Sequence, residues 1–324
     1  MLIQTRMFLL VGLMLAILYG VITGIGVLTG GTGFSYVYII IAFVFLGFQY
    51  MLGPTMVRLT MRVKYVTEKE EPDLHRMVED LAKTAGIPKP KVGVSQLNIP
   101  NAFAYGRTIG DGHVCVTQGI KNLLSRDELK AVLAHEISHI RHRDMAIITL
   151  LSAIPLILYW IAISLLFRGM WGGGSRNNSG SIVMLIGFGA FIMYFITNLL
   201  VLYGSRIREY YADRGAVELG CRPHHLATAL YKLVHGNARF KNSPELKRVE
   251  GVKAFFVNDP SRARYEIADL SSIDRDMSGA IEYDELLELH SKEVQLTTGD
   301  RLMELFTTHP NMLKRIKHLS SLAV

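Results

Sequence analysis

The chain has little cysteine and little charge for its length. Its 324 residues include only 2 cysteines, Cys115 and Cys221, and neither belongs to a CxxC pattern. No disulfide framework and no thiolate metal site is indicated, so we expect both to be small buried residues of a protein in a reducing compartment. Charged residues make up 19% and hydrophobic residues 50% of the chain, and the mean hydropathy is +0.26. This composition is too apolar for an ordinary soluble protein and predicts a membrane protein.

The formal net charge of +7 is the second compositional feature. Lysine and arginine are spread along the chain, and no group of aromatic residues accompanies them as a stacking platform. This pattern does not indicate nucleic-acid binding. Attraction to anionic lipid headgroups explains the charge more simply, so we expect membrane lipids and no nucleic acid among the partners.

Four apolar runs are long enough to cross a bilayer. They cover residues 7–29, 36–57, 145–167 and 182–203. No A-x-A-like cleavage site closes the first run, and a second run follows at once, so we expect a hairpin and not a cleaved signal. Basic residues lie at both of its ends, with Arg6 before it and Arg58, Arg62 and Lys64 after it. Their bias predicts that both ends face the cytoplasm.

A soluble segment of mixed α/β character follows, from about residue 60 to residue 144. Its pattern predicts a helix over 72–85 that stops at Gly86, and strands over 91–97 and 113–117. Between these strands, residues 101–106 read Asn-Ala-Phe-Ala-Tyr-Gly. We interpret them either as an edge segment able to accept an extended peptide, or simply as one strand of a small sheet.

The stretch 129–144 contains the sequence His135-Glu136-Ile137-Ser138-His139, an HExxH pattern. A capping box at 125–128 and apolar residues at helical spacing predict a helix, which we expect to continue into the third apolar run. Histidines at i and i+4 share one helix face and can bind one zinc ion, while Glu136 can take a proton from zinc-bound water. The alternative is an amphipathic helix with surface histidines and a solvated basic end at 141–144.

A third zinc ligand is expected after the fourth apolar run. Glu209 follows that run by six residues, and His139 precedes the third run by six. An antiparallel hairpin therefore returns Glu209 to the two histidines, and His135, His139 and Glu209 form a His2Glu ligand set. Asp213, one helical turn further on, can accept a hydrogen bond from a ligand histidine. The alternative for Glu209 is a salt bridge to Arg206 or Arg208.

HExxH, an apolar hairpin and then Glu-x-x-Ala-Asp together resemble the HtpX membrane proteases, relatives of the CAAX prenyl endopeptidases. The resemblance includes residues 101–106 and the C-terminal segments 308–310 and 315–316. It implies a zinc endopeptidase of the cell inner (plasma) membrane, with its active site facing the cytoplasm, that cuts misfolded or exposed membrane proteins or unfolded polypeptides. It also makes Asn101 and His309 candidates for holding substrate or stabilising the oxyanion. His309, which precedes Pro310, can equally be a helix-capping or packing residue.

Residues 274–285 depart from this family pattern and fit an EF-hand calcium loop, with Gly279 at position 6 and Ile281 at position 8. The oxygen donors are predicted at Asp274, Asp276, Ser278, Ala280, Glu282 and Glu285. The alternative is a solvated helix-turn-helix inserted between the family's helices. Zinc is therefore the expected cofactor, and calcium a second candidate.

The sequence thus predicts an α-helical membrane protein with four transmembrane helices and an α+β, zincin-like metalloprotease domain. We expect residues 1–59 to form a first transmembrane hairpin, 60–144 the first part of the catalytic domain, 145–203 a second hairpin, and 204–324 the second part, with the EF-hand-like insertion at about 265–295. A prenyl-protein endopeptidase is the nearest alternative function. A non-catalytic membrane calcium sensor on a zincin scaffold is the alternative from another class.

Overall fold

The computed structural model describes residues 2–29, 33–171, 179–240, 243–248, 256–257, 263–270, 273–292 and 297–323. The glycine-rich segments that join the first to the second apolar run and the third to the fourth, at 30–33 and 171–178, lie almost wholly outside these residues. The chain divides into two compact units. The first contains residues 1–52 and 146–207, and the second contains residues 53–145 and 208–324.

Four helices among the described residues are long and apolar enough to span a membrane, as the sequence predicts. The candidate spans are Thr5–Ile25, Ile39–Thr60, Asp144–Met170 and Gly180–Glu218. They belong to the helices α1 (Leu2–Thr29), α2 (Gly33–Thr60), α6 (Asp144–Leu151) with α7 (Ala153–Trp171), and α8 (Ser179–Glu218).

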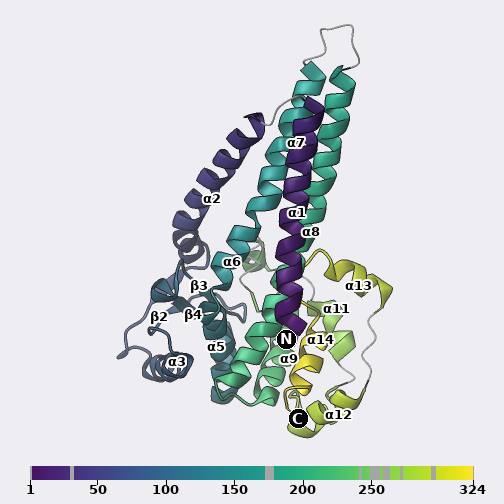
Figure 1. The fold of residues 1–324 in the computed structure, drawn as a ribbon. Coiled ribbons are helices and arrows are strands. Elements are labelled where there is room, and N and C mark those ends of the chain that lie inside the picture. Colours follow the sequence, from purple (N-terminus) through teal and green to yellow (C-terminus); the bar gives the residue numbers. More distant parts are fainter. Residues whose placement is uncertain are drawn as a thin grey trace. The chain divides into compact units, whose positions relative to one another are not determined.

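Within the first unit, α1, α7 and α8 run alongside one another (Figure 1). Leu10 and Met14 of α1 pack with Ile154 and Leu158 of α7 in a buried apolar cluster. Many other large apolar side chains of these helices are exposed, among them Phe188, which is 56% exposed. Such a surface is stable only in an apolar solvent, so it fits a helical hairpin in lipid.

The second unit contains a four-stranded mixed sheet. Its strands are β1 (Val63–Tyr65), β2 (Lys91–Ser95), β3 (Ala102–Tyr105) and β4 (His113–Thr117), in the order β1-β2-β4-β3. β2 and β4 are parallel, and the other two pairs are antiparallel. β3 lies at one edge of the sheet formed by the described strands, which fits both interpretations of residues 101–106; binding of an extended peptide there stays a prediction. β1 was not predicted.

Alternate residues of these strands face two different apolar cores. Val114 and Val116 pack with the helices α3 (Pro72–Ala85) and α5 (Arg126–Arg141), while Cys115 and Phe103 belong to a second cluster. That second cluster also contains Phe256. Cys115 and Cys221 are both free and buried, as predicted.

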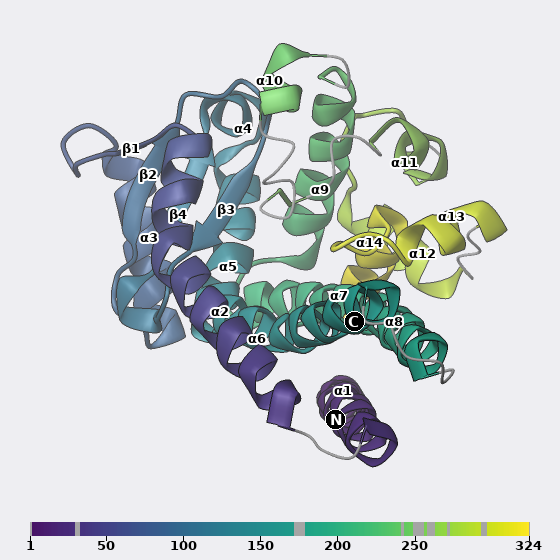
Figure 2. The same cartoon turned by 90° about the horizontal axis from the view of Figure 1, so that it is seen from above.

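The remaining elements of the second unit are short helices around a central one, α9. They are η1 (Ile109–Asp111), α4 (Gln118–Leu123), α9 (Pro223–Ala238), α10 (Pro244–Arg248), α11 (Ala263–Leu270), α12 (Tyr283–Ser291), α13 (Thr298–Glu304) and α14 (Met312–Ser320). α9 lies between α5 on one side and α14 on the other (Figure 2). It therefore connects the helix that carries HExxH with the C-terminal helices.

The expectation that the HExxH helix continues into the third apolar run is wrong. α5 begins with the predicted capping box of Ser125 and Glu128 but ends at Arg141. Arg143 then takes a left-handed conformation with φ 57°, and α6 starts at Asp144. The left-handed residue interrupts the helix and lets Asp144 bind back to His139.

α8 approaches α5 closely at Gly215. A Cβ atom added to Gly215 would lie 2.8 Å from Ser138 Cβ and 2.0 Å from Ser138 Oγ. Ser138 lies inside the HExxH sequence, so this close approach sets the spacing between α5 and the part of α8 that carries Glu209 and Asp213.

We therefore expect Gly215→Ala to destabilise the protein. Overpacking costs about 1–3 kcal/mol, which exceeds the roughly 0.5–1 kcal/mol that alanine contributes to a helix interior. The apparent Tm of the purified protein in detergent should fall by about 2–6 °C. Gly189→Ala is the matched control, because it lies in the same helix with nothing within 4 Å of the added Cβ. An unchanged Tm for Gly215→Ala contradicts this account.

Candidate metal centre

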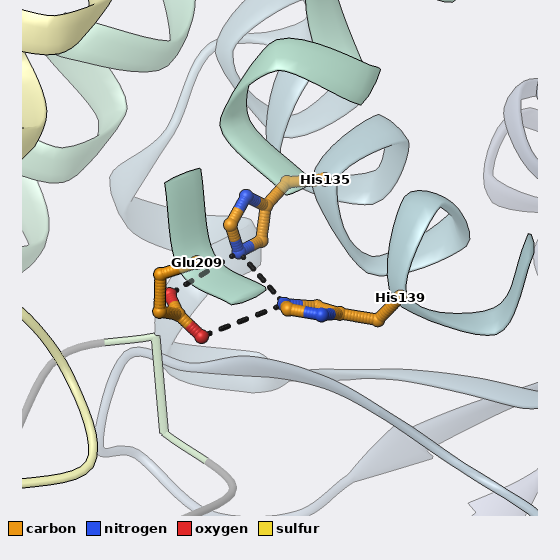
Figure 3. A group of neighbouring side chains, drawn as sticks. All are labelled: His135, His139 and Glu209. Atoms are coloured by element: carbon orange, nitrogen blue, oxygen red, sulfur yellow. Dashed lines mark hydrogen bonds and ion pairs between the residues drawn. The ribbon is translucent and has the colours of Figure 1, made fainter. Parts of the chain in front are cut away.

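α5 and α8 bring His135, His139 and Glu209 together in the second unit (Figure 3). The Nε2 atoms of the two histidines lie 3.1 Å apart. Glu209 Oε2 is 3.6 Å from Nε2 of His135, and Glu209 Oε1 is 3.6 Å from Nε2 of His139. Donor atoms of three residues that span 74 positions of the sequence, from His135 to Glu209, thus lie close together.

This arrangement has the dimensions of a zinc site. Tetrahedral zinc with ligand distances of about 2.0–2.1 Å separates its donor atoms by about 3.3 Å. Two imidazole nitrogens and a carboxylate are also the donor set of many catalytic zinc sites. The residues present therefore fit the metal, and the remaining tetrahedral position is left for water or substrate.

Each histidine is held by a carboxylate on its other ring nitrogen. Nδ1 of His135 lies 3.0 Å from Asp213 Oδ1, and Nδ1 of His139 lies 2.7 Å from Asp144 Oδ2. An Nδ1–H that donates to a carboxylate leaves the Nε2 lone pair pointing toward the metal position. The prediction for Asp213 agrees with this contact. Asp144 is only 5% exposed, so its interpretation as part of a solvated end is wrong.

Arg315 of α14 is the other charged residue that holds the centre together. Its guanidinium makes two hydrogen bonds to Asp213, from Nε (3.0 Å) and from Nη2 (2.6 Å). Its Nη1 lies 2.9 Å from Glu209 Oε2, and the side chain is completely buried. Arg208 of α8 pairs with Asp144 instead, so Glu209 does not form the alternative salt bridge to Arg208.

The two histidines differ in proton affinity when no metal is bound. Burial disfavours the charged form of His135, but Asp213 and Glu209 outweigh burial and raise the pKa of His135 to about 9. Burial and the neighbouring His135 lower the pKa of His139 to about 4. At neutral pH the pair therefore carries one positive charge, with His135 protonated on both ring nitrogens and His139 neutral.

Glu136 and His309 are both buried, at 5% and 8% exposure. Glu136 makes no hydrogen bond or ion pair to another described residue, so its carboxylate is available for proton transfer. Nδ1 of His309 lies 3.3 Å from Glu209 Oε1, and neither ring nitrogen has a hydrogen-bond partner in the described part of the chain. Asn311 is the N-cap of α14, so the interpretation of His309 as a helix cap is wrong.

Asn101 connects the sheet to the Arg315 network. Its Oδ1 accepts a hydrogen bond from the backbone N–H of Val257 (2.9 Å), and the carbonyl of Val257 accepts one from Arg315 Nη1 (3.0 Å). Asn101 is therefore linked through Val257 to the arginine that contacts Asp213 and Glu209. A role toward substrate stays a prediction.

Three of the residues that the sequence predicts as calcium ligands also lie close together. One carboxylate oxygen each from Asp274, Asp276 and Glu285 lies within 4.8 Å of the others. Ser278 Oγ lies 3.4 Å from the carbonyl oxygen of Ala280. Glu282 is the N-cap of α12 and forms a capping box with Glu285.

Comparisons with known proteins agree on one family. The sequence profile described as "Peptidase family M48" matches residues 68–323. A "Protease HtpX homolog" of Methanothermobacter thermautotrophicus is 50% identical over 231 residues, which cover 71% of this chain and 85% of that protein. The "Protease HtpX homolog" of Pyrococcus furiosus is 34% identical over 316 residues, 97% of this chain and 95% of that protein.

A solved structure shares the fold. The crystal structure of S. mikatae Ste24p superposes with a TM-score of 0.52 at 16% sequence identity and covers 95% of this chain. The chain spans 64% of the length of Ste24p. At this identity the likeness concerns the fold alone.

The proton on the histidine pair leads to a prediction for metal binding. A ligand imidazole must be neutral, so zinc has to displace the proton of His135 at any pH below about 9. Between about pH 5 and pH 8, we expect roughly one proton to be released for each zinc ion bound. The affinity for zinc should therefore fall about tenfold for each unit by which the pH is lowered. Calorimetry at pH 6 in buffers of different ionisation enthalpy measures the proton count. A count of zero or two contradicts the assignment.

Proposed function

The chain belongs to peptidase family M48 and is a membrane metalloprotease, and from this premise we propose that it is a zinc-dependent endopeptidase of the HtpX type. The single observation that carries the proposal is the convergence of His135, His139 and Glu209, whose donor atoms have the separations and chemistry of a zinc site. A zinc ion held there would supply Lewis acidity, which polarises a peptide carbonyl and makes water more acidic.

Glu136 is the proposed general base. It directly follows the ligand His135, is buried, and is not engaged by another described residue. A carboxylate in this position can take a proton from the attacking water and deliver it to the amine that leaves. Asp213 and Asp144 hold the two imidazoles in the orientation that directs Nε2 toward the metal position.

Arg315 and His309 both lie beside Glu209, the third ligand. Arg315 holds Glu209 and Asp213 in place through its ion pairs. His309 lies beside Glu209 with an unpartnered, buried Nε2, so it can donate a hydrogen bond to a developing negative oxygen. We propose His309 for this role and Asn101 as a second candidate for binding substrate.

The proposed substrates are misfolded or exposed membrane proteins and unfolded polypeptides, cut on the cytoplasmic side of the cell inner (plasma) membrane. The HtpX relatives and the basic residues that flank the first hairpin support this proposal. The edge strand β3 supports binding of an extended peptide by strand addition. In this proposal the catalytic domain consists of residues 60–144 and 204–324, and the hairpin 145–203 interrupts it.

A CAAX-type prenyl-protein endopeptidase is the second candidate, because the HtpX proteases that the sequence resembles are relatives of those enzymes. A membrane part with four candidate spans among the described residues favours the HtpX type. Cleavage of an unfolded membrane protein, compared with cleavage of a prenylated peptide, distinguishes the two. A non-catalytic calcium sensor on this scaffold is disfavoured by an intact ligand set with Glu136 beside it.

Replacing Glu209 by Ala should remove the third ligand. We expect the affinity for zinc to fall by about a hundredfold or more, since even the loss of a supporting residue typically costs 10–100-fold. Metal analysis of the purified protein after competition with a chelator measures the change. Glu218→Ala is the control, because Glu218 lies on the same helix and pairs only with arginines at the surface. Equal zinc content in both variants contradicts the ligand assignment.

Replacing Glu136 by Gln should abolish proteolysis while zinc stays bound. The amide has the shape of the carboxylate but cannot accept the proton, so the cleavage rate should fall by about 10²–10⁴-fold. Cleavage of an unfolded membrane protein by zinc-loaded enzyme measures the rate, with Glu218→Gln as the control. A Glu136→Gln enzyme that cleaves at the full rate rules out this mechanism.

A further inference from the structure

Asp274 and Asp276, in the loop between α11 and α12, lie close to Glu285 in the first turn of α12. None of the three has a role in the peptidase chemistry described above. We propose that residues 274–285 bind one calcium ion, and that the bound ion stabilises the packing of α9, α12 and α14, the helix that carries Arg315.

The carboxylates of this loop lack a cation partner. Asp274 is only 6% exposed. In the described part of the chain, no lysine, arginine or histidine forms an ion pair with Asp274, Asp276 or Glu285, and the one cation inside the loop, Arg275, pairs with Glu288. Asp274 accepts hydrogen bonds from the hydroxyl of Tyr231 and from the backbone N–H groups of Ser278 and Gly279, which stabilise its carboxylate but do not neutralise its charge. A bound cation would supply the countercharge.

The donor set selects calcium among the common cations. Oxygen atoms are available at positions 1, 3, 5, 7, 9 and 12 of the loop, and neither histidine nor cysteine lies within it. Calcium takes six to eight oxygen ligands with flexible geometry, whereas zinc prefers nitrogen and sulfur. Met277 and Gly279 have positive φ values, 56° and 80°, which turn the backbone around the converging carboxylates.

The loop is fastened to α9 at two places. The hydroxyl of Thr228 donates to the carbonyl of Ile281 (2.8 Å) and accepts from the N–H of Ile281 (3.0 Å). The hydroxyl of Tyr231 donates to Asp274 Oδ2 (2.9 Å). Thr228 and Tyr231 lie three residues apart on one face of α9, so an ion that fixes the loop also fixes its contact with this helix.

The exit helix α12 is held against α14, the helix that carries Arg315. Nζ of Lys317 donates to the carbonyl oxygens of Leu289 (2.7 Å), His290 (2.6 Å) and Lys292 (2.8 Å) at the C-terminal end of α12. Lys317 follows Arg315 by two residues. Calcium in the loop would therefore stabilise the packing of α14 against α12, and with it the position of Arg315 beside Asp213 and Glu209.

The test uses the full-length protein in detergent, with calcium, magnesium or a calcium chelator in the buffer. Ligands that bind only the folded state raise its stability. We expect calcium, but not magnesium, to raise the apparent Tm, with a Kd between about 10⁻⁶ and 10⁻³ M. Hydrogen exchange of the amides in 283–291 and 312–320 should slow by about tenfold in calcium.

Two variants keep the test decisive if one of them folds poorly. Glu285→Gln and Asp276→Asn should each weaken calcium binding by about tenfold or more, because each removes a charged ligand. Asp284→Asn is the matched control, since it removes one negative charge from the first turn of α12 at a position that supplies no ligand. It should respond to calcium like the unchanged protein.

The proposal is overturned if the unchanged protein has the same Tm with calcium and with the chelator. It is equally overturned if Glu285→Gln and Asp276→Asn keep the calcium response, or if exchange in 312–320 is unaffected. None of these measurements uses zinc or peptide cleavage, so a negative result leaves the proposed peptidase function as it stands.

Discussion

The bidentate ion pair between Arg315 and Asp213 is the interaction on which the candidate metal centre depends. Asp213 holds His135, and Arg315 also reaches Glu209, so one guanidinium positions both a histidine and a carboxylate of the centre. All of these groups are buried, and buried charges are stable only when they are paired with good geometry. The C-terminal helix is therefore part of the centre, although the HExxH sequence lies about 180 residues before it.

The centre is organised as two similar sets of contacts. His135 is held by Asp213 and Arg315, and His139 is held by Asp144 and Arg208. In each set a carboxylate orients an imidazole, and an arginine compensates the charge of the carboxylate. The left-handed conformation of Arg143 is what allows the second set, because it turns the chain so that Asp144 lies against His139.

Local patterns predicted the local structure well. The capping box of Ser125 and Glu128, the helix stop at Gly86 and the edge strand in 101–106 are all present, since each depends on residues close together in sequence. The continuation of the HExxH helix was predicted wrongly. The residues 141–144 look solvated by composition, and the contact that buries Asp144 comes from His139 and Arg208, which helical spacing does not reveal.

The sequence by itself determined the number of apolar spans, the membership of a membrane metalloprotease family, and the shared helix face of His135 and His139, because these follow from hydropathy, similarity and the period of a helix. Only the tertiary structure decided that Asp144, Arg208 and Arg315 hold the centre, that the loop 274–285 is anchored to α9, and that α12 is anchored to α14. These contacts join residues far apart in the chain. For Asp144, Arg208 and Arg315 the partner is set by position in space, and no helical period or spacing between apolar runs encodes that position.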